Sequence, residues 1–124
     1  MSGIKKETAG NTTQILLFTQ PYAAISVVVS AALGVTVGSK KIVKAGTPLG
    51  GNLDARTTPF TGGTSENTQG VLVHDVDVTD GDANGALLLS GFVNTNRLET
   101  DAQALITTEV KTALNGKVWF VAEA

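Results

Sequence analysis

Four aspartates between positions 75 and 82 are the residues of this 124-residue chain best suited to metal chemistry. Carboxylate oxygens are the ligands that Ca²⁺ prefers in proteins. A calcium loop that began at Asp75 would need glycine at its sixth position and glutamate at its twelfth, where this chain has Asp80 and Ala86. The spacing therefore predicts a turn rich in residues that accept left-handed backbone angles.

Histidine and serine chemistry is equally difficult to assemble. His74 is the single histidine and cysteine is absent, so a zinc site would need three carboxylates, which is an unusual ligand set. Ser90 lies in an apolar run outside any Gly-x-Ser-x-Gly motif. The stretch from Gly46 to Gly51 lacks the lysine and hydroxyl residue that end a phosphate loop. We expect no catalytic residue, no metal and no cofactor, and hence not an enzyme.

Charge and apolar content argue against further classes of function. Nine basic and eleven acidic residues are scattered, so no basic stripe could neutralise the phosphates of a nucleic acid. Polar residues interrupt the first apolar region, which leaves no span of about 20 apolar residues for a membrane. One Trp, one Tyr and four Phe offer few platforms for a small-molecule substrate. The absence of cysteine fits assembly in a reducing cytosol.

The first twenty residues predict a flexible N-terminal arm (1–20) ahead of a single domain (21–124). Residues 1–12 hold too few apolar groups to offset the entropy of ordering them. A short apolar run of strand length follows, made of Ile15, Leu16, Leu17 and Phe18. Such a strand can add to an exposed sheet edge of a partner. It can equally be an ordinary strand of the body, because periodicity does not locate a strand's partner.

β-Branched residues predict that most of the body is strand. Residues 24–43 divide into three short strands joined by tight turns at Gly34 and Gly38. Gly46 and Pro48 mark a further turn, and the paired glycines at 50–51 mark another. Residues 52–69 are polar and lack periodicity, which predicts a long loop.

The most regular pattern is a hairpin. Residues 71–76 alternate and would place His74 in a strand, and residues 79–85 form a turn rich in aspartate and glycine. Residues 86–93 return as a nearly uninterrupted apolar strand, which indicates burial on both faces.

One C-terminal helix is readable. Thr100 and Gln103 stand at the spacing of a capping box, and Gly116 stands where a left-handed C-terminal turn is expected. One apolar face would consist of Ala102, Ile106, Val110 and Ala113. A strand over residues 117–122 follows. Its Trp119 is expected to be buried because its neighbours are apolar, and the alternative is an exposed anchor for a partner.

Three segments together resemble a known family. They are Lys44–Leu49 (KAGTPL), Gly70–Asp77 (GVLVHDVD) and Gly91–Leu98 (GFVNTNRL). Their order and spacing are similar to the turn, the strand with its turn and the later strand of the lambda-type head decoration proteins of tailed bacteriophages. The likeness extends over about residues 42 to 122, and the ending Leu114–Val118 is also similar.

The resemblance implies a mainly β fold: a small compact tulip-like or barrel-like domain with little helix. It implies a structural virion protein, made in the cytoplasm of a bacterial host, that binds the major capsid protein on the outer capsid surface as a homotrimer. In such proteins an N-terminal arm contacts the capsid. The candidate capsid-binding residues are therefore Ile15, Leu16, Leu17 and Phe18.

A β-rich stretch around residues 25–37 is additional to the lambda protein. It also resembles the capsid-anchoring base of head fibres, which is the nearest alternative function. A small β-barrel that binds a ligand is a second alternative. The stretch offers apolar residues for self-association, although a core strand would look the same. These residues are Ala31, Ala32, Leu33, Val35 and Val37.

Overall fold

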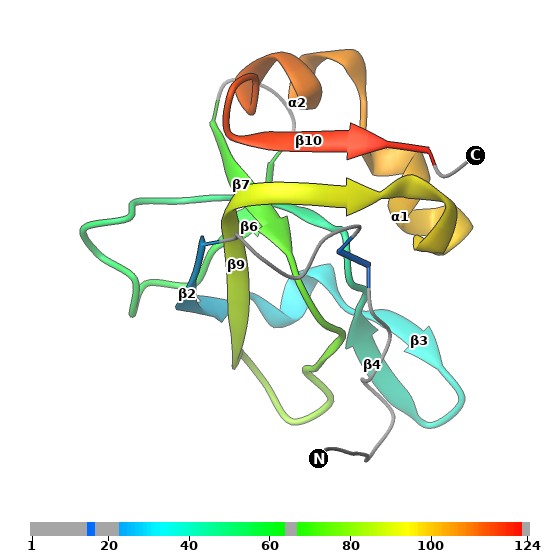
Figure 1. Ribbon diagram of the computed structural model, residues 1–124. Coiled ribbons are helices and arrows are strands. Elements are labelled where there is room, and N and C mark those ends of the chain that lie inside the picture. The colour runs from blue at the N-terminus through cyan, green and yellow to red at the C-terminus, as the bar shows by residue number, and fades with distance from the viewer. Residues whose placement is uncertain (1–14, 17–22, 64–66, 123–124) are drawn as a thin grey trace, which may run out of the picture.

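A computed structural model describes residues 15–16, 23–63 and 67–122 of the chain (Figure 1). It is mainly β with two short α-helices, which confirms the predicted fold class. The strands are β2 (Ala23–Val29), β3 (Val35–Val37), β4 (Lys40–Val43), β5 (Pro48–Gly50), β6 (Thr61–Gly62), β7 (Thr68–Leu72), β8 (Val76–Asp77), β9 (Ala83–Asn94) and β10 (Val118–Val121). The helices are the 3₁₀ turns η1 (Ala31–Leu33) and η2 (Thr95–Arg97) and the α-helices α1 (Thr100–Leu105) and α2 (Thr108–Ala113).

The larger sheet curls until its pairing closes. Its order is β10-β9-β7-β5-β6, and β2 joins it by pairing with β9. Phe60, directly before β6, bridges to Val29 at the end of β2. The Phe60 amide donates to the Val28 carbonyl at 2.7 Å, and the Ser30 amide donates to the Phe60 carbonyl at 3.0 Å. The strands from β9 through β6 to β2 therefore form a barrel-like ring.

β10 is parallel to the second half of β9. Parallel neighbours need a crossover connection, and η2, α1 and α2 supply it. The two halves of β9 run in different directions (Figure 1), so that β10 and the helices lie together at one end of the molecule. The β3–β4 hairpin lies at the other end, where β3, β4 and β8 form a separate small sheet.

Strands β7 and β9 separate two apolar cores. Neighbouring residues on each strand face opposite ways, so Leu72 and Leu87 pack inside the barrel while Val71 and Leu88 pack against the helices. Leu87 and Leu88 are both fully buried, which confirms the predicted two-sided burial of this strand. The barrel core consists of Val27, Val29, Val43, Leu49, Phe60, Leu72, Val76, Val78 and Leu87. The core beneath the helices consists of Ile15, Leu16, Ala45, Val71, Val73, Leu88, Val93, Leu98, Ala102, Val110, Leu114 and Val118.

The predicted hairpin is right in its pairing and wrong in its connection. β7 and β9 are antiparallel, but the chain bends through His74, which is exposed and outside any strand, and then forms β8. β8 pairs with β4 of the small sheet. There Asp77 accepts hydrogen bonds from the Thr79 hydroxyl at 2.6 Å and amide at 2.9 Å, which lower the pKa of Asp77. The Thr79 hydroxyl in turn accepts from the Lys41 amide at 2.9 Å.

Three further predictions of turns and loops need correction. Residues 24–43 do form three strands, but η1 replaces the tight turn expected at Gly34. The turn expected at residues 50–51 is partly strand, since β5 runs to Gly50 and its Leu49 is fully buried. The stretch 52–69 contains β6 and the fully buried Phe60, which ties it to the barrel.

The predicted single helix is two helices. Thr107 separates them because its hydroxyl accepts a hydrogen bond from the Val110 amide at 3.3 Å and so caps the start of α2. The capping box at Thr100 is wrong, because the N-cap of α1 is Glu99 and it makes no side-chain capping bond. Gly116 has a positive φ of 81°, as the expected C-terminal turn requires.

The body begins before the expected boundary at residue 20. Ile15 and Leu16 are 0% and 3% exposed and belong to the core beneath the helices. The Asn94 amide donates to the Ile15 carbonyl at 2.8 Å, and Leu16 bridges to Val93 of β9. Of the two readings of the apolar run, the ordinary strand therefore describes these two residues.

Replacing Ile15 or Leu16 with alanine should lower the free energy of unfolding by about 2–5 kcal/mol, because each change removes buried apolar surface and leaves a cavity. Leu53→Ala is the matched control, since Leu53 is 37% exposed, and it should change stability by only about 0.5 kcal/mol. Urea unfolding of the three variants measures the difference. Equal, small effects in all three would contradict the placement of Ile15 and Leu16 in the core.

Candidate interaction surfaces

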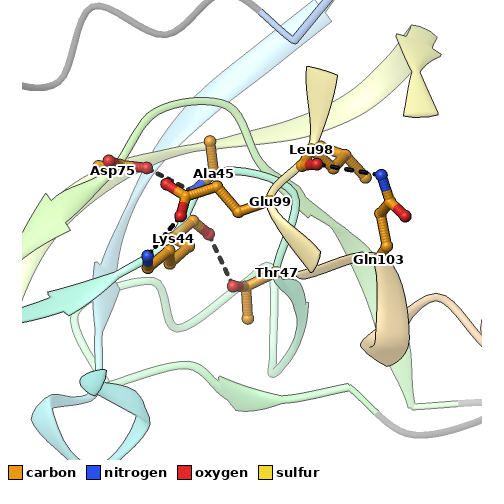
Figure 2. A network of polar contacts seen from close by, with 7 residues as sticks. All are labelled: Lys44, Ala45, Thr47, Asp75, Leu98, Glu99 and Gln103. Atoms are coloured by element: carbon orange, nitrogen blue, oxygen red, sulfur yellow. Dashed lines mark hydrogen bonds and ion pairs between the residues drawn. The ribbon is translucent and has the colours of Figure 1, made fainter. Parts of the chain in front are cut away.

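The segments that resemble head decoration proteins meet at one corner of the fold (Figure 2). The Ala45 amide donates to Asp75 Oδ1 at 2.8 Å, and the Gly46 amide donates to the Leu72 carbonyl at 2.7 Å. These bonds join the first segment to the second. Gly46 has a positive φ of 92°, and a Cβ there would collide with the Leu98 side chain of the third segment.

An ion pair closes the same corner. Lys44 Nζ lies 2.6 Å from Glu99 Oε1, and the Lys44 side chain is only 15% exposed. The hydrogen bond with Glu99 raises the pKa of Lys44, and the negative charges of Glu99, Asp101 and Asp75 act in the same direction against the effect of burial. A lysine that acts as a nucleophile needs a lowered pKa. The corner is therefore held by a structural ion pair in which Lys44 stays charged.

Three of the four aspartates between positions 75 and 82 accept hydrogen bonds from backbone amides. Asp75 accepts from Ala45, Asp77 accepts from Thr79, and Asp82 Oδ1 accepts from the Ala31 amide at 2.8 Å. The bonds of Asp75 and Asp82 join residues 30 and 51 positions apart, and the bond of Asp77 is local to its own turn. In the ranges that the structure describes, no group of three His, Cys, Asp or Glu side chains could hold a metal ion.

An aromatic face lies on the outer side of β9 and β10. Trp119 is 48% exposed, so the predicted burial of this residue is wrong. Its ring stacks on Phe92 of β9, with centroids 6.1 Å apart and planes at 15°. Val121, two residues along β10, is 37% exposed. We call Phe92, Trp119 and Val121 the aromatic face.

An apolar groove lies between α1 and the β3 strand. Its apolar walls include Leu33, Val35 and Leu105, and its volume is about 120 Å³. Val35 and Leu105 are 41% and 48% exposed. Asp101 and the ion-paired Lys44 border it. We call this the α1 groove. It contains two of the residues that the sequence suggested for self-association: Val35, which is exposed, and Leu33, which is half-buried and packs against the barrel core.

The candidate capsid-binding run is only partly described. The side chains of Ile15 and Leu16 are occupied by the core of their own chain and are not accessible to a partner in this conformation. Leu17 and Phe18 lie outside the described residues. Hydropathy alone could not distinguish Ile15 and Leu16 from Leu17 and Phe18, because all four residues are apolar.

Comparison of the sequence with models of known protein families and with curated proteins gave no match. The likeness to head decoration proteins therefore rests on the sequences of the three segments and on their order and spacing. No helix in the described part of the chain is both long and apolar enough to cross a membrane.

Gly46→Ala should lower the free energy of unfolding by about 2–5 kcal/mol, because the new Cβ combines a strained backbone angle with a clash against Leu98. Gly38→Ala is the matched control. Gly38 also has a positive φ, of 63°, but nothing lies within 4 Å of its added Cβ, so only the backbone cost of about 1 kcal/mol applies. Chemical denaturation of both variants tests the corner, and equal losses would show that Leu98 does not constrain it.

Trp119→Ala should cost about 1–3 kcal/mol of folding stability, because the change removes the stacking contact with Phe92 and the buried part of a side chain that is 48% exposed. Leu114→Ala, at a fully buried position of the same end of the molecule, should cost about 2–5 kcal/mol. Thermal melting of the two variants beside the parent distinguishes them. A loss as large for Trp119 as for Leu114 would contradict the exposure of the aromatic face.

Proposed function

We propose that this protein is a structural component of a tailed-bacteriophage virion, which decorates and stabilises the outer surface of the capsid as a homotrimer bound to the major capsid protein. The observation that carries this proposal is the corner where residues 44–49, 70–77 and 91–98 meet. These segments resemble head decoration proteins in their order and spacing. In the structure they contact one another at one corner of a single folding unit.

The contacts of the charged side chains also support a structural role. Asp75, Asp77 and Asp82 each accept hydrogen bonds that hold turns in place, and Lys44 is held in an ion pair. The charged groups at the corner therefore stabilise the backbone and do not converge on a reacting atom, as a nucleophile, its base and an orienting acid would.

Most of the large apolar side chains that are exposed among the described residues gather on two separate surfaces. The aromatic face lies on β9 and β10, and the α1 groove lies beside β3. Clustered apolar surface of this kind marks a site of association. A decoration protein needs such surfaces, because it binds the shell and its own copies at the same time.

Binding to shells tests the proposal directly. Purified protein is mixed with expanded shells assembled from the major capsid protein encoded beside its gene, and co-sedimentation measures the bound fraction. We expect saturable binding with a copy number divisible by three and a higher temperature of shell disruption. A folded protein that fails to co-sediment with these shells at any concentration would overturn the proposal.

The apolar run gives the same assay a residue-level prediction. Leu17→Ser combined with Phe18→Ser should weaken shell binding by roughly ten-fold or more, since two apolar side chains that meet a partner each contribute about 1.5–3 kcal/mol. Leu53→Ser is the matched control for a change from an exposed leucine to serine and should bind as the parent does. Equal binding by the double variant and the parent would remove this run from the capsid contact.

A further inference from the structure

We propose that copies of this chain associate head to tail, with the aromatic face of one copy seated in the α1 groove of the next. The proposal builds on the proposed function, for which it supplies the contact between copies. The partner is a second copy of this chain.

The aromatic face has the form of a rigid projecting anchor. Stacking on Phe92 fixes the Trp119 ring against the sheet, and 48% of the side chain remains exposed. An anchor that is already held in one orientation loses little side-chain entropy when it binds. β10 is also the edge strand of its sheet among the described strands, so no other strand covers this end. Tryptophans with these properties are the residue type most often found to dominate interface energies.

The α1 groove is a matching cavity. Its volume of about 120 Å³ compares with the roughly 150 Å³ of a cavity that holds benzene. It is therefore large enough for the edge of an aromatic ring and too small for most drug-sized ligands, whose pockets start at about 300 Å³. Its apolar walls, Leu33, Val35 and Leu105, come from η1, β3 and α1, and none of them belongs to the aromatic face.

The positions of the aromatic face and the α1 groove favour a ring of copies. The two surfaces share no residue: the aromatic face lies on β9 and β10, and the α1 groove lies between α1 and β3 (Figure 1). Both can therefore be occupied in one molecule at the same time. A contact between two different patches, repeated by rotation, is the geometry that generates closed cyclic oligomers such as trimers.

Charge selects this pairing over contact between two aromatic faces. The exposed Lys117 stands two residues before Trp119, and the exposed Asp101 borders the α1 groove, where the charge of Lys44 is already paired with Glu99. Head-to-tail docking brings a cation toward an acid. Docking of two aromatic faces would bring Lys117 toward its own copy, and like charges in proximity oppose association.

Complementary variants test the contact. Trp119→Ser removes the anchor and keeps the groove, while Val35→Asp places a charge in the groove and keeps the anchor. We expect the parent to form trimers by mass measurement across concentrations, and each variant alone to have its self-association weakened by at least about 30-fold, the effect of losing one dominant interface residue. Mixed in equal amounts, the two variants should form a complex of two chains, because each supplies the half that the other lacks.

Thermal melting of each variant separates lost binding from lost folding, since both changed side chains are at least 41% exposed. Leu53→Ser should associate as the parent does. Self-association of either folded variant at the parental level would overturn the proposal. So would failure of the two folded variants to bind each other.

A charge exchange tests the orientation without touching the apolar contact. Lys117→Glu and Asp101→Lys should each weaken association by about three- to five-fold, which is the usual size of an exposed ion pair. The two changes in one chain should restore association, because the pairing is re-formed with reversed signs. A folded double variant that associates no better than the single variants would overturn the head-to-tail orientation.

Shell binding keeps this proposal separable from the proposed function. A parent protein that binds shells but is a single copy at every concentration, both free and on the shell, would overturn the head-to-tail contact and leave the decoration role standing. Trimers that depend on Trp119 and Val35 but do not bind shells would support the contact and overturn the decoration role.

Discussion

The backbone pairing of β9 is the constraint on which the rest of the structure depends. Its first half pairs with β2 and β7 and belongs to the barrel, and its second half pairs with β10 and with Leu16. Because successive side chains alternate between faces, one register places Leu87 inside the barrel and Leu88 under the helices. A shift by one residue would reverse both cores at once, so neither core can be repacked independently of the other.

The sequence predicted the fold class and most strands because β-branched runs and glycines carry local information that survives in the tertiary structure. The errors lie where that information is ambiguous. Thr107 lies between two helical stretches, and the hydrogen bond that its hydroxyl accepts from the Val110 amide marks the start of a new helix. Phe60 is a single apolar residue in a polar stretch, and its burial depends on a bridge to Val29 that no local pattern reports.

Trp119 shows that local sequence patterns also fail to predict which side chains form the candidate surfaces. The run Val118 to Val121 is apolar at every position, so a period of two cannot tell which side faces the core. The crossover through α1 and α2 decides it: Val118 packs under the helices, and Trp119 is left on the outer side. The hydrogen-bond partners of the carboxylates are likewise not visible in the local sequence. Asp75 and Asp82 look like ligands in sequence, and their actual partners are amides 30 and 51 residues away.

Exposing the chain's one tryptophan carries a physical cost that an isolated domain would avoid, because apolar surface left in water favours aggregation. Stacking on Phe92 covers part of the ring, but Val121 extends the exposed strip along an edge strand. An assembly resolves this conflict. In the proposed assembly on a shell with many identical sites, each copy would be held by its shell contact while its aromatic face and its α1 groove meet neighbouring copies, so the effective concentration of partners would be high. The contact between copies would then be stronger on the capsid than in free solution, and a small groove and a single anchoring ring would be sufficient.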